Sequence, residues 1–229
     1  MTVRIDAMGP EELAARIREP WRTPEGAVLR ALVPPTLELL TRGESVSPEE
    51  IAAAAGLPAA AARAALDQFG GVDWDEQGRV VGLGLTLRPT PHRFGVAGRT
   101  LFAWCALDTL IFPVVLGRPA SIESPCRGTG EAVRVVVTPR GVEAVEPASA
   151  VVSVVAPQDL ASLRRVLCAN AHFFRSAEAA SGWLERHPEA TIRPVEEVFR
   201  LGRVIAEGVF GVARPAGAER GPTGRGNER

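Results

Sequence analysis

Two thiols and one carboxyl group are the side chains of this 229-residue chain whose types and spacing best suit chemistry. Cys105 and Asp108 stand three residues apart, and Cys168 follows 60 residues after Asp108. On a helix, residues at i and i+3 share a face, so the thiol and the carboxyl group can meet. The flanking residues, 99–103 and 109–113, are apolar enough to bury the pair. A buried carboxyl group can hold a proton near neutral pH and exchange it with a neighbouring thiol.

The remaining candidate residues are weaker. Cys126 lies in the segment Ser-Pro-Cys-Arg-Gly and is expected to be structural. No two cysteines have Cys-x-x-Cys spacing, which argues against a zinc knuckle and a thioredoxin-like redox pair. His172 lies four residues after Cys168 and is a candidate ligand, although a packing role is commoner for such a histidine. A cysteine–histidine dyad with His172 as base stays formally open, but the candidate nucleophile Cys105 has an aspartate beside it.

Composition indicates an ordinary globular protein. The chain is 46% hydrophobic and 23% charged, with a net charge of −1, so no global field attracts nucleic acid or membrane. All of its basic residues are arginine, which excludes a lysine Schiff base. No stretch reaches the roughly 18 apolar residues of a membrane span, and the first residues lack the apolar run of a secretory signal. We therefore expect a cytoplasmic protein, where an odd number of cysteines argues against a disulfide framework.

The first ninety residues have the element order of a winged helix-turn-helix domain. Turn and capping signals predict helices over 10–20, 26–42, 48–55 and 59–69, and then strands over 72–74 and 79–87. This region carries 13 acidic and 9 basic side chains, a net charge of −4. Its would-be recognition helix offers only Arg63 and Gln68 to DNA, whereas operator binding needs several phosphate contacts. We therefore expect a scaffold and no nucleic-acid partner.

The rest of the chain reads as a mixed domain. We place a boundary near residue 90, in a loop rich in proline and glycine. The patterns predict helices over 99–111, 157–169, 177–186 and 195–209, and strands over 120–124, 132–138, 142–145, 151–155 and 171–174. The expected fold is α+β, with a winged-helix-like domain (1–90), a domain of short antiparallel sheets packed by helices (91–212) and a disordered tail (213–229).

Five segments between residues 99 and 202 resemble the organomercurial (alkylmercury) lyase family. The most specific are the Trp-Cys-Ala-Leu-Asp string and the distal cysteine before His-Phe-Phe. The matching segments are Thr100-Leu-Phe-Ala-Trp-Cys-Ala-Leu-Asp-Thr-Leu-Ile-Phe-Pro113, Leu116-Gly-Arg118, Val145-Glu-Pro147, Cys168-x-x-x-His-Phe-Phe174 and Phe199-x-Leu-Gly202. In this family, the N-terminal winged-helix-like part is a scaffold, which agrees with the charge argument.

The resemblance implies a reaction and a role for each candidate residue. Cys105 and Cys168 would be the thiolates that bind mercury, and Asp108 would carry the proton that breaks the carbon–mercury bond and would also contact the Hg(II) product. Thiolates select soft metals over hard cations. The substrate would be an alkyl or aryl mercurial, and no resident cofactor is implied. External small thiols would support turnover, and these or a mercuric reductase would accept the Hg(II).

The resemblance also implies the surroundings of the site. Cys126 matches a structural cysteine of the family. Some relatives carry a second cysteine directly after the distal one, where this chain has Ala169, and the change bears on how mercury leaves. An apolar pocket would hold the organic group, with candidates Phe102, Trp104, Phe112, Phe173 and Phe174. Two other hypotheses stay open: a winged-helix soft-metal sensor that regulates transcription, and a family member that binds mercurials without turnover.

The sensor hypothesis generates the first prediction. If residues 1–90 are a scaffold, the protein gives no gel shift with promoter DNA at physiological salt, with or without Hg²⁺, because too few basic groups face the phosphates. A shift that Hg²⁺ adds or removes would instead support the sensor.

Overall fold

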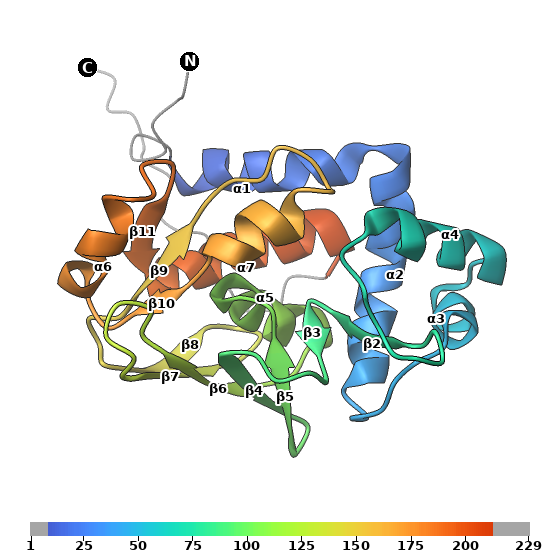
Figure 1. The fold of residues 1–229 in the computed structure, drawn as a ribbon, viewed down its shortest axis with the longest axis horizontal. Coiled ribbons are helices and arrows are strands. Elements are labelled where there is room, and N and C mark those ends of the chain that lie inside the picture. The colour runs from blue at the N-terminus through green and yellow to red at the C-terminus, as the bar shows by residue number, and fades with distance from the viewer. Residues whose placement is uncertain (1–8, 213–229) are drawn as a thin grey trace, which may run out of the picture.

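The computed structural model describes residues 9–212, and its N-terminal part is helical (Figure 1). The predicted helices are confirmed, with a 3-10 turn, Glu19–Arg22, after the first. The second helix contains Pro34 and Pro35 and still runs as one element. A capping box starts the third, in which the Ser47 hydroxyl accepts from the Glu50 N–H and the Glu50 carboxylate accepts from the Ser47 N–H. The helices are α1 (Pro10–Arg18), α2 (Pro24–Leu40), α3 (Pro48–Ala55) and α4 (Ala59–Phe69).

An antiparallel sheet of eight strands follows, in the order β1-β2-β3-β5-β4-β6-β7-β8. In β6 and β7 buried and exposed side chains alternate, so one face of the sheet packs on the core. The strands are β1 (Asp73–Trp74), β2 (Val80–Leu83), β3 (Leu85–Thr86), β4 (His92–Val96), β5 (Arg99–Ala103), β6 (Ala120–Pro125), β7 (Ala132–Val137) and β8 (Val142–Glu146).

The prediction of a helix over 99–111 is wrong in its first half. Residues 99–103 form β5, which pairs with β4 as a hairpin, and helix α5 begins only at Ala106 and ends at Leu116. Ala97 and Gly98, both with positive φ, form the turn of the hairpin. In β4 the side chains of His92, Phe94 and Val96 are buried in alternation, a two-residue period that favours a strand.

The segment that ends at Cys168 lies between two strands of a second, three-stranded antiparallel sheet. Its order is β10-β9-β11, with β9 at Val151–Val154, β10 at Phe173–Phe174 and β11 at Thr191–Pro194. The predicted helix over 157–169 is reduced to a π-helix, Leu163–Cys168, and β11 was not predicted. The last helices, α6 (Ala177–Leu184) and α7 (Val195–Phe210), are confirmed.

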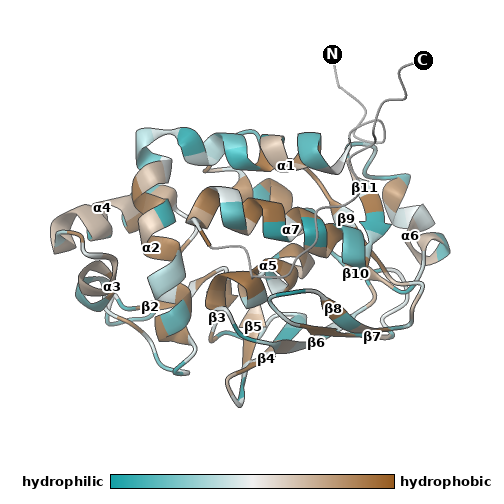
Figure 2. Cartoon of the chain, turned by 180° about the vertical axis from the view of Figure 1, so that it is seen from behind, coloured by the Kyte–Doolittle hydropathy of each residue, from teal (hydrophilic) through white to brown (hydrophobic). Residues whose placement is uncertain are grey.

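Helix α5 lies at the centre of the layers. Helix α1 packs on α7, α7 packs on α5, and α5 packs on strands β4, β5 and β6, while α2, α3 and α4 stand to one side (Figure 1). Residues of α5 are buried nearly all round, and the helix is strongly apolar in colour, whereas the outer α1 is largely hydrophilic (Figure 2). A helix that is apolar on every side must be covered on every side. The residues that start α5 are therefore held from several directions.

The two predicted domains share the large sheet. Strand β3 pairs with β5 across residue 90, with Leu85 opposite Ala103, so β1, β2 and β3 continue the sheet of the mixed domain. The boundary at residue 90 and the winged-helix geometry of residues 1–90 stay predictions, and the tail over 213–229 lies outside the described residues. Within residues 9–212, none of the helices combines the length and the apolar character that crossing a membrane requires.

Close packing of α7 on α5 generates a stability prediction. A Cβ at Gly202 of α7 would stand 2.9 Å from Cγ1 of Ile111 on α5, so in the Gly202→Ala variant either the Ile111 side chain or the two helices must shift. We expect the free energy of unfolding in urea to fall by about 1–3 kcal/mol.

Gly182 of α6 is the matched control, because nothing lies within 4 Å of a Cβ added there. Gly182→Ala should raise the free energy of unfolding by about 0.5–1 kcal/mol, the usual gain in an exposed helix. Equal effects of the two substitutions would contradict the packing argument.

Candidate active site

Cys105 occupies the junction between β5 and α5. It is the N-cap of α5, with an extended backbone (φ −150°, ψ 169°), and its Sγ accepts from the backbone N–H of Asp108 at 3.4 Å. Backbone bonds hold the residues on either side, from Trp104 N–H to Gly84 O (2.8 Å) and from Ala106 N–H to Ala171 O (3.0 Å). The contact between residues 105 and 108 therefore comes from N-cap geometry, in which the capping side chain meets the third helical residue, and not from a shared helix face.

Asp108 and Cys168 complete the cluster that the sequence predicted. The Cys168 thiol donates to Oδ2 of Asp108 at 3.9 Å. One ligand atom from each of Cys105, Asp108 and Cys168 lies within 4.8 Å of the others, and in the described part of the chain these residues form the one such group of metal-ligating side chains. The structure thus brings all three predicted residues together.

Cys168 is held by the second sheet and by its own π-helix. Leu163 and Leu167 of the π-helix are buried. Beyond Cys168, the buried Ser153 of β9 donates its hydroxyl to Asn170 O (2.6 Å) and accepts from the His172 N–H (3.0 Å). Two segments far apart in sequence are therefore fixed separately, and their thiols meet at the N-terminus of α5.

Burial sets the protonation of the cluster. Desolvation raises the pKa of Asp108 to about 6, against hydrogen bonds from Cys105 and Cys168 that lower it. Desolvation also raises the pKa of the Cys105 thiol well above its ordinary value. For Cys168, the hydrogen bond with Cys105 lowers the pKa, while burial and the Asp108 charge raise it by more. Without a metal the thiols hold their protons, and Asp108 titrates near neutral pH.

The cluster opens onto an apolar cavity of about 80 Å³. Asp108 and Cys168 lie in its wall, and the other wall residues are almost all apolar. Of the aromatic residues predicted to hold an organic group, Trp104 and Phe112 line this cavity, and Phe102, Phe173 and Phe174 do not. Three further aromatic wall residues come from distant elements and were not predicted: Trp21, Phe69 and Phe210.

His172 and Cys126 stand apart from the cluster. The His172 ring packs edge-on against Phe174 and Trp183, and burial lowers its pKa to about 4. Cys126 is buried in a turn, where its Sγ accepts from the Arg175 N–H at 3.3 Å. Both therefore have packing and hydrogen-bonding roles, as the commoner reading of each residue predicts.

Arg164 is a residue of the site that sequence reasoning missed. It lines the cavity four residues before Cys168, and its guanidinium lies over the Trp104 ring, 4.0 Å from the centroid. The guanidinium also pairs with Asp73 of β1 at 2.9 Å. No spacing rule links residues 73, 104 and 164, so only the fold could reveal the contact.

Two thiols lie beside a carboxyl group at an apolar cavity, with Cys168 and Asp108 in the cavity wall. This is the donor set of an enzyme for soft, thiophilic metal centres. The comparisons with known proteins agree. The family model described as alkylmercury lyase matches residues 85–207, and the model described as the helix-turn-helix domain of alkylmercury lyase matches residues 12–84. The chain belongs to the alkylmercury lyase family.

Individual relatives support the assignment over most of the chain. An alkylmercury lyase of Staphylococcus epidermidis is 49% identical over 84% of this chain and 89% of its own length. Those of Bacillus cereus and Streptomyces lividans are 47% and 48% identical, over 85% and 80% of this chain and 90% and 85% of their own. A solved structure of the mercury-bound form of MerB2 has a TM-score of 0.74 at 26% identity, covering 87% of this chain and 99% of that one. The regulator hypothesis is not favoured.

The raised pKa of Asp108 generates a stability prediction. The folded state binds the proton of this carboxyl group more tightly than the unfolded chain, whose value is 3.8, so folding stability falls as pH rises from about 4 to about 6. Asp108→Asn removes the buried charge. In urea unfolding the variant should be more stable than the wild type by about 2–3 kcal/mol near neutral pH, and equally stable below about pH 4.

Asp75→Asn is the control of opposite sign. The backbone N–H of Arg79 lowers the pKa of the Asp75 carboxyl, so its ionised form stabilises the fold at neutral pH and this contribution is lost in acid. The variant should be less stable than the wild type near neutral pH. A neutral-pH stability of Asp108→Asn at or below that of the wild type would contradict the assignment of a raised pKa.

Proposed function

We propose that this chain cleaves the carbon–mercury bond of alkyl and aryl mercurials by protonolysis, in the reaction R–Hg⁺ + H⁺ → R–H + Hg²⁺. The observation that carries the proposal is the cluster of Cys105, Asp108 and Cys168, with ligand atoms within 4.8 Å of one another at an apolar cavity. Family membership and the lyase relatives support the same reaction.

Binding would begin at the thiols. Each thiol that bonds to mercury gives up its proton, because the thiolate is the metal ligand. The Cys168 thiol already donates to the Asp108 carboxylate, so this oxygen is placed to receive a displaced proton. The R group would occupy the apolar cavity beside Trp104 and Phe112. Two thiolates donate electron density to mercury and make the departing carbon more basic.

Asp108 would then deliver its proton to that carbon. The electron pair of the carbon–mercury bond takes the proton, the hydrocarbon leaves, and Hg(II) stays bound to the two thiolates beside the ionised carboxylate. A carboxyl group with a pKa of about 6 is suited to this exchange near neutral pH, because it is readily protonated and readily deprotonated. Hg(II) neutralises the two thiolates, the Asp108 carboxylate keeps its negative charge, and the second of the two thiol protons leaves to solvent.

Release of Hg(II) would use thiols from outside, either small thiols or those of a mercuric reductase. Cys168 is partly exposed and lines the cavity, whereas Cys105 is fully buried, so an incoming thiolate would displace Cys168 first. We propose a cytoplasmic enzyme without a resident cofactor, because all three cysteines are free and such thiols persist in a reducing compartment. Arg63 pairs with Asp67 and lies over Trp74, which supports the absence of a nucleic-acid partner.

Single-cysteine variants test the proposal. Cys105→Ser and Cys168→Ser should each lower the release of benzene from a phenylmercury salt, or of methane from a methylmercury salt, by more than about a thousandfold with excess thiol present. The reason is that each variant lacks one of the two thiolates that activate the bond. Headspace gas chromatography measures the hydrocarbon directly.

Two further variants complete the assay. Cys126→Ser is the matched control and should retain release, because Cys126 lies outside the cluster. Asp108→Asn should lose release while still binding one Hg(II), because both thiols remain. Wild-type rates in either Cys105→Ser or Cys168→Ser would overturn the mechanism.

A further inference from the structure

The Asp73 carboxylate lies outside the catalytic cluster and binds side chains from several segments of the chain. Its side chain is only 12% exposed and has three partners. Oδ1 pairs with Nη2 of Arg164 at 2.9 Å, and Oδ2 accepts from Nε1 of Trp104 at 3.0 Å and from the Thr86 hydroxyl at 3.3 Å. A largely buried carboxylate with charged and neutral donors on both oxygens is fixed in position.

The strand opposite leaves room for this carboxylate. Asp73 of β1 faces Gly82 of β2 in the sheet register. A Cβ at Gly82 would lie 2.7 Å from Oδ2 of Asp73 and 2.6 Å from the Thr86 hydroxyl, closer than a carbon atom can approach. The hairpin is therefore built around the carboxylate, which is not a chance surface group.

Two of the three partners of Asp73, Trp104 and Arg164, belong to the two segments that carry the thiols. Trp104 directly precedes Cys105, and Arg164 lies four residues before Cys168, in the same π-helix. Arg164 also donates to Gly71 O at 3.4 Å, and its guanidinium stacks on Trp104. Asp73 itself comes from neither segment. It belongs to the region that matches the helix-turn-helix model, whereas both partners lie within the alkylmercury lyase model.

We propose that Asp73 is a positioning residue for carbon–mercury cleavage, which holds Trp104 and Arg164 together and so fixes the spacing between the Cys105 and Cys168 segments. This inference rests on the proposed function. Asp73 is not part of the cavity wall, whereas Trp104 and Arg164 both are, so Asp73 acts through them and does not touch the substrate. The consequence is that a residue of the helix-turn-helix region sets the geometry of the thiol pair.

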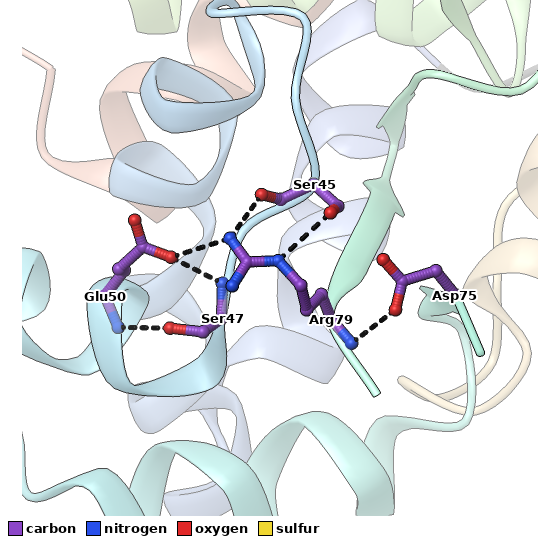
Figure 3. A network of polar contacts seen from close by, with 5 residues as sticks. All are labelled: Ser45, Ser47, Glu50, Asp75 and Arg79. Carbon is purple, nitrogen blue, oxygen red and sulfur yellow. Dashed lines mark hydrogen bonds and ion pairs between the residues drawn. The ribbon is translucent and has the colours of Figure 1, made fainter. Parts of the chain in front are cut away.

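A pair of aspartates two residues apart allows a matched experiment. Asp73→Asn keeps the shape of the side chain and removes the charge that holds Arg164. Asp75→Asn makes the same change in the same hairpin, but Asp75 belongs to a separate network with Arg79, Ser45 and Glu50, which joins the turn before β2 to α3 (Figure 3). Both variants weaken the hairpin, and only Asp73→Asn removes the ion pair with Arg164 and one of the two acceptor oxygens that hold the cavity residues.

Turnover of a phenylmercury salt with excess thiol is the first readout. We expect kcat of Asp73→Asn to fall about tenfold, the scale of a small misplacement of reacting groups, with KM changed less than about twofold. Asp75→Asn should keep both constants. The double variant Asp73→Asn with Arg164→Gln should lose little more than either single variant, since both substitutions remove the same ion pair.

The second readout needs no turnover. Phenylarsine oxide bonds through As(III) to two neighbouring thiols and releases one water, so intact-mass spectrometry follows how readily Cys105 and Cys168 are bridged. Bridging should slow about tenfold in Asp73→Asn and stay at the wild-type rate in Asp75→Asn. If the wild type failed to release hydrocarbon, the proposed function would fall, and this measurement would still test the spacing.

The outcomes separate positioning from general stability. Wild-type kcat and wild-type bridging in Asp73→Asn would overturn the proposal, as would equal losses in Asp73→Asn and Asp75→Asn. If Asp73→Asn does not fold, Arg164→Gln removes the same ion pair from its 39% exposed partner and is compared with Asp75→Asn in both assays. Unchanged bridging in Arg164→Gln would then overturn it.

Discussion

The contact among two thiols and one carboxyl group in a dry site is the constraint on which the rest of the structure depends. Three groups that each form an anion lie within 4.8 Å of one another, and burial makes each charge costly. The N-terminus of α5 partly offsets this cost, because the helix dipole favours negative charge at Cys105 and Asp108 and the Asp108 N–H donates to the Cys105 sulfur. The two thiols of the cluster therefore hold their protons without a metal, and a soft cation can displace these protons.

The fold maintains this contact by fixing the segment of Cys105 and Asp108 and the segment of Cys168 independently. Helix α5 is covered by α7 on one side and by the large sheet on the other, and Gly202 lets α7 approach closely. Cys168 arrives on a π-helix, and Ser153 of the small sheet ties down the residues that follow. Neither segment can shift alone without breaking buried contacts. A distance between two sulfur atoms is thus maintained by two sheets and two helices.

The sequence predicted the members of the site better than their local structure. Spacing and residue type selected Cys105 and Asp108, and the resemblance to the alkylmercury lyases added Cys168. The prediction of a helix over 99–111 was wrong in its first half, because this apolar run fits a buried strand as well as it fits a helix. Only the pairing of β5 with β3 and β4 shows that residues 99–103 form a strand. Asp73 and Arg164 were beyond reach, since a contact across 91 residues follows no local period.

The helix-turn-helix region contributes to the active site in two ways: through Asp73, and through side chains that line the apolar cavity. Trp21, Val33 and Phe69 contribute apolar surface to the cavity from the 3-10 turn, α2 and α4. Helix α4, in the position of a recognition helix, uses Phe69 inward, and its Arg63 is paired with Asp67 of the same helix. The net acidic charge of this region is unfavourable for contacts with phosphates, whereas its inward apolar side chains suit an apolar substrate. The region is therefore best understood as one part of the wall of the substrate cavity.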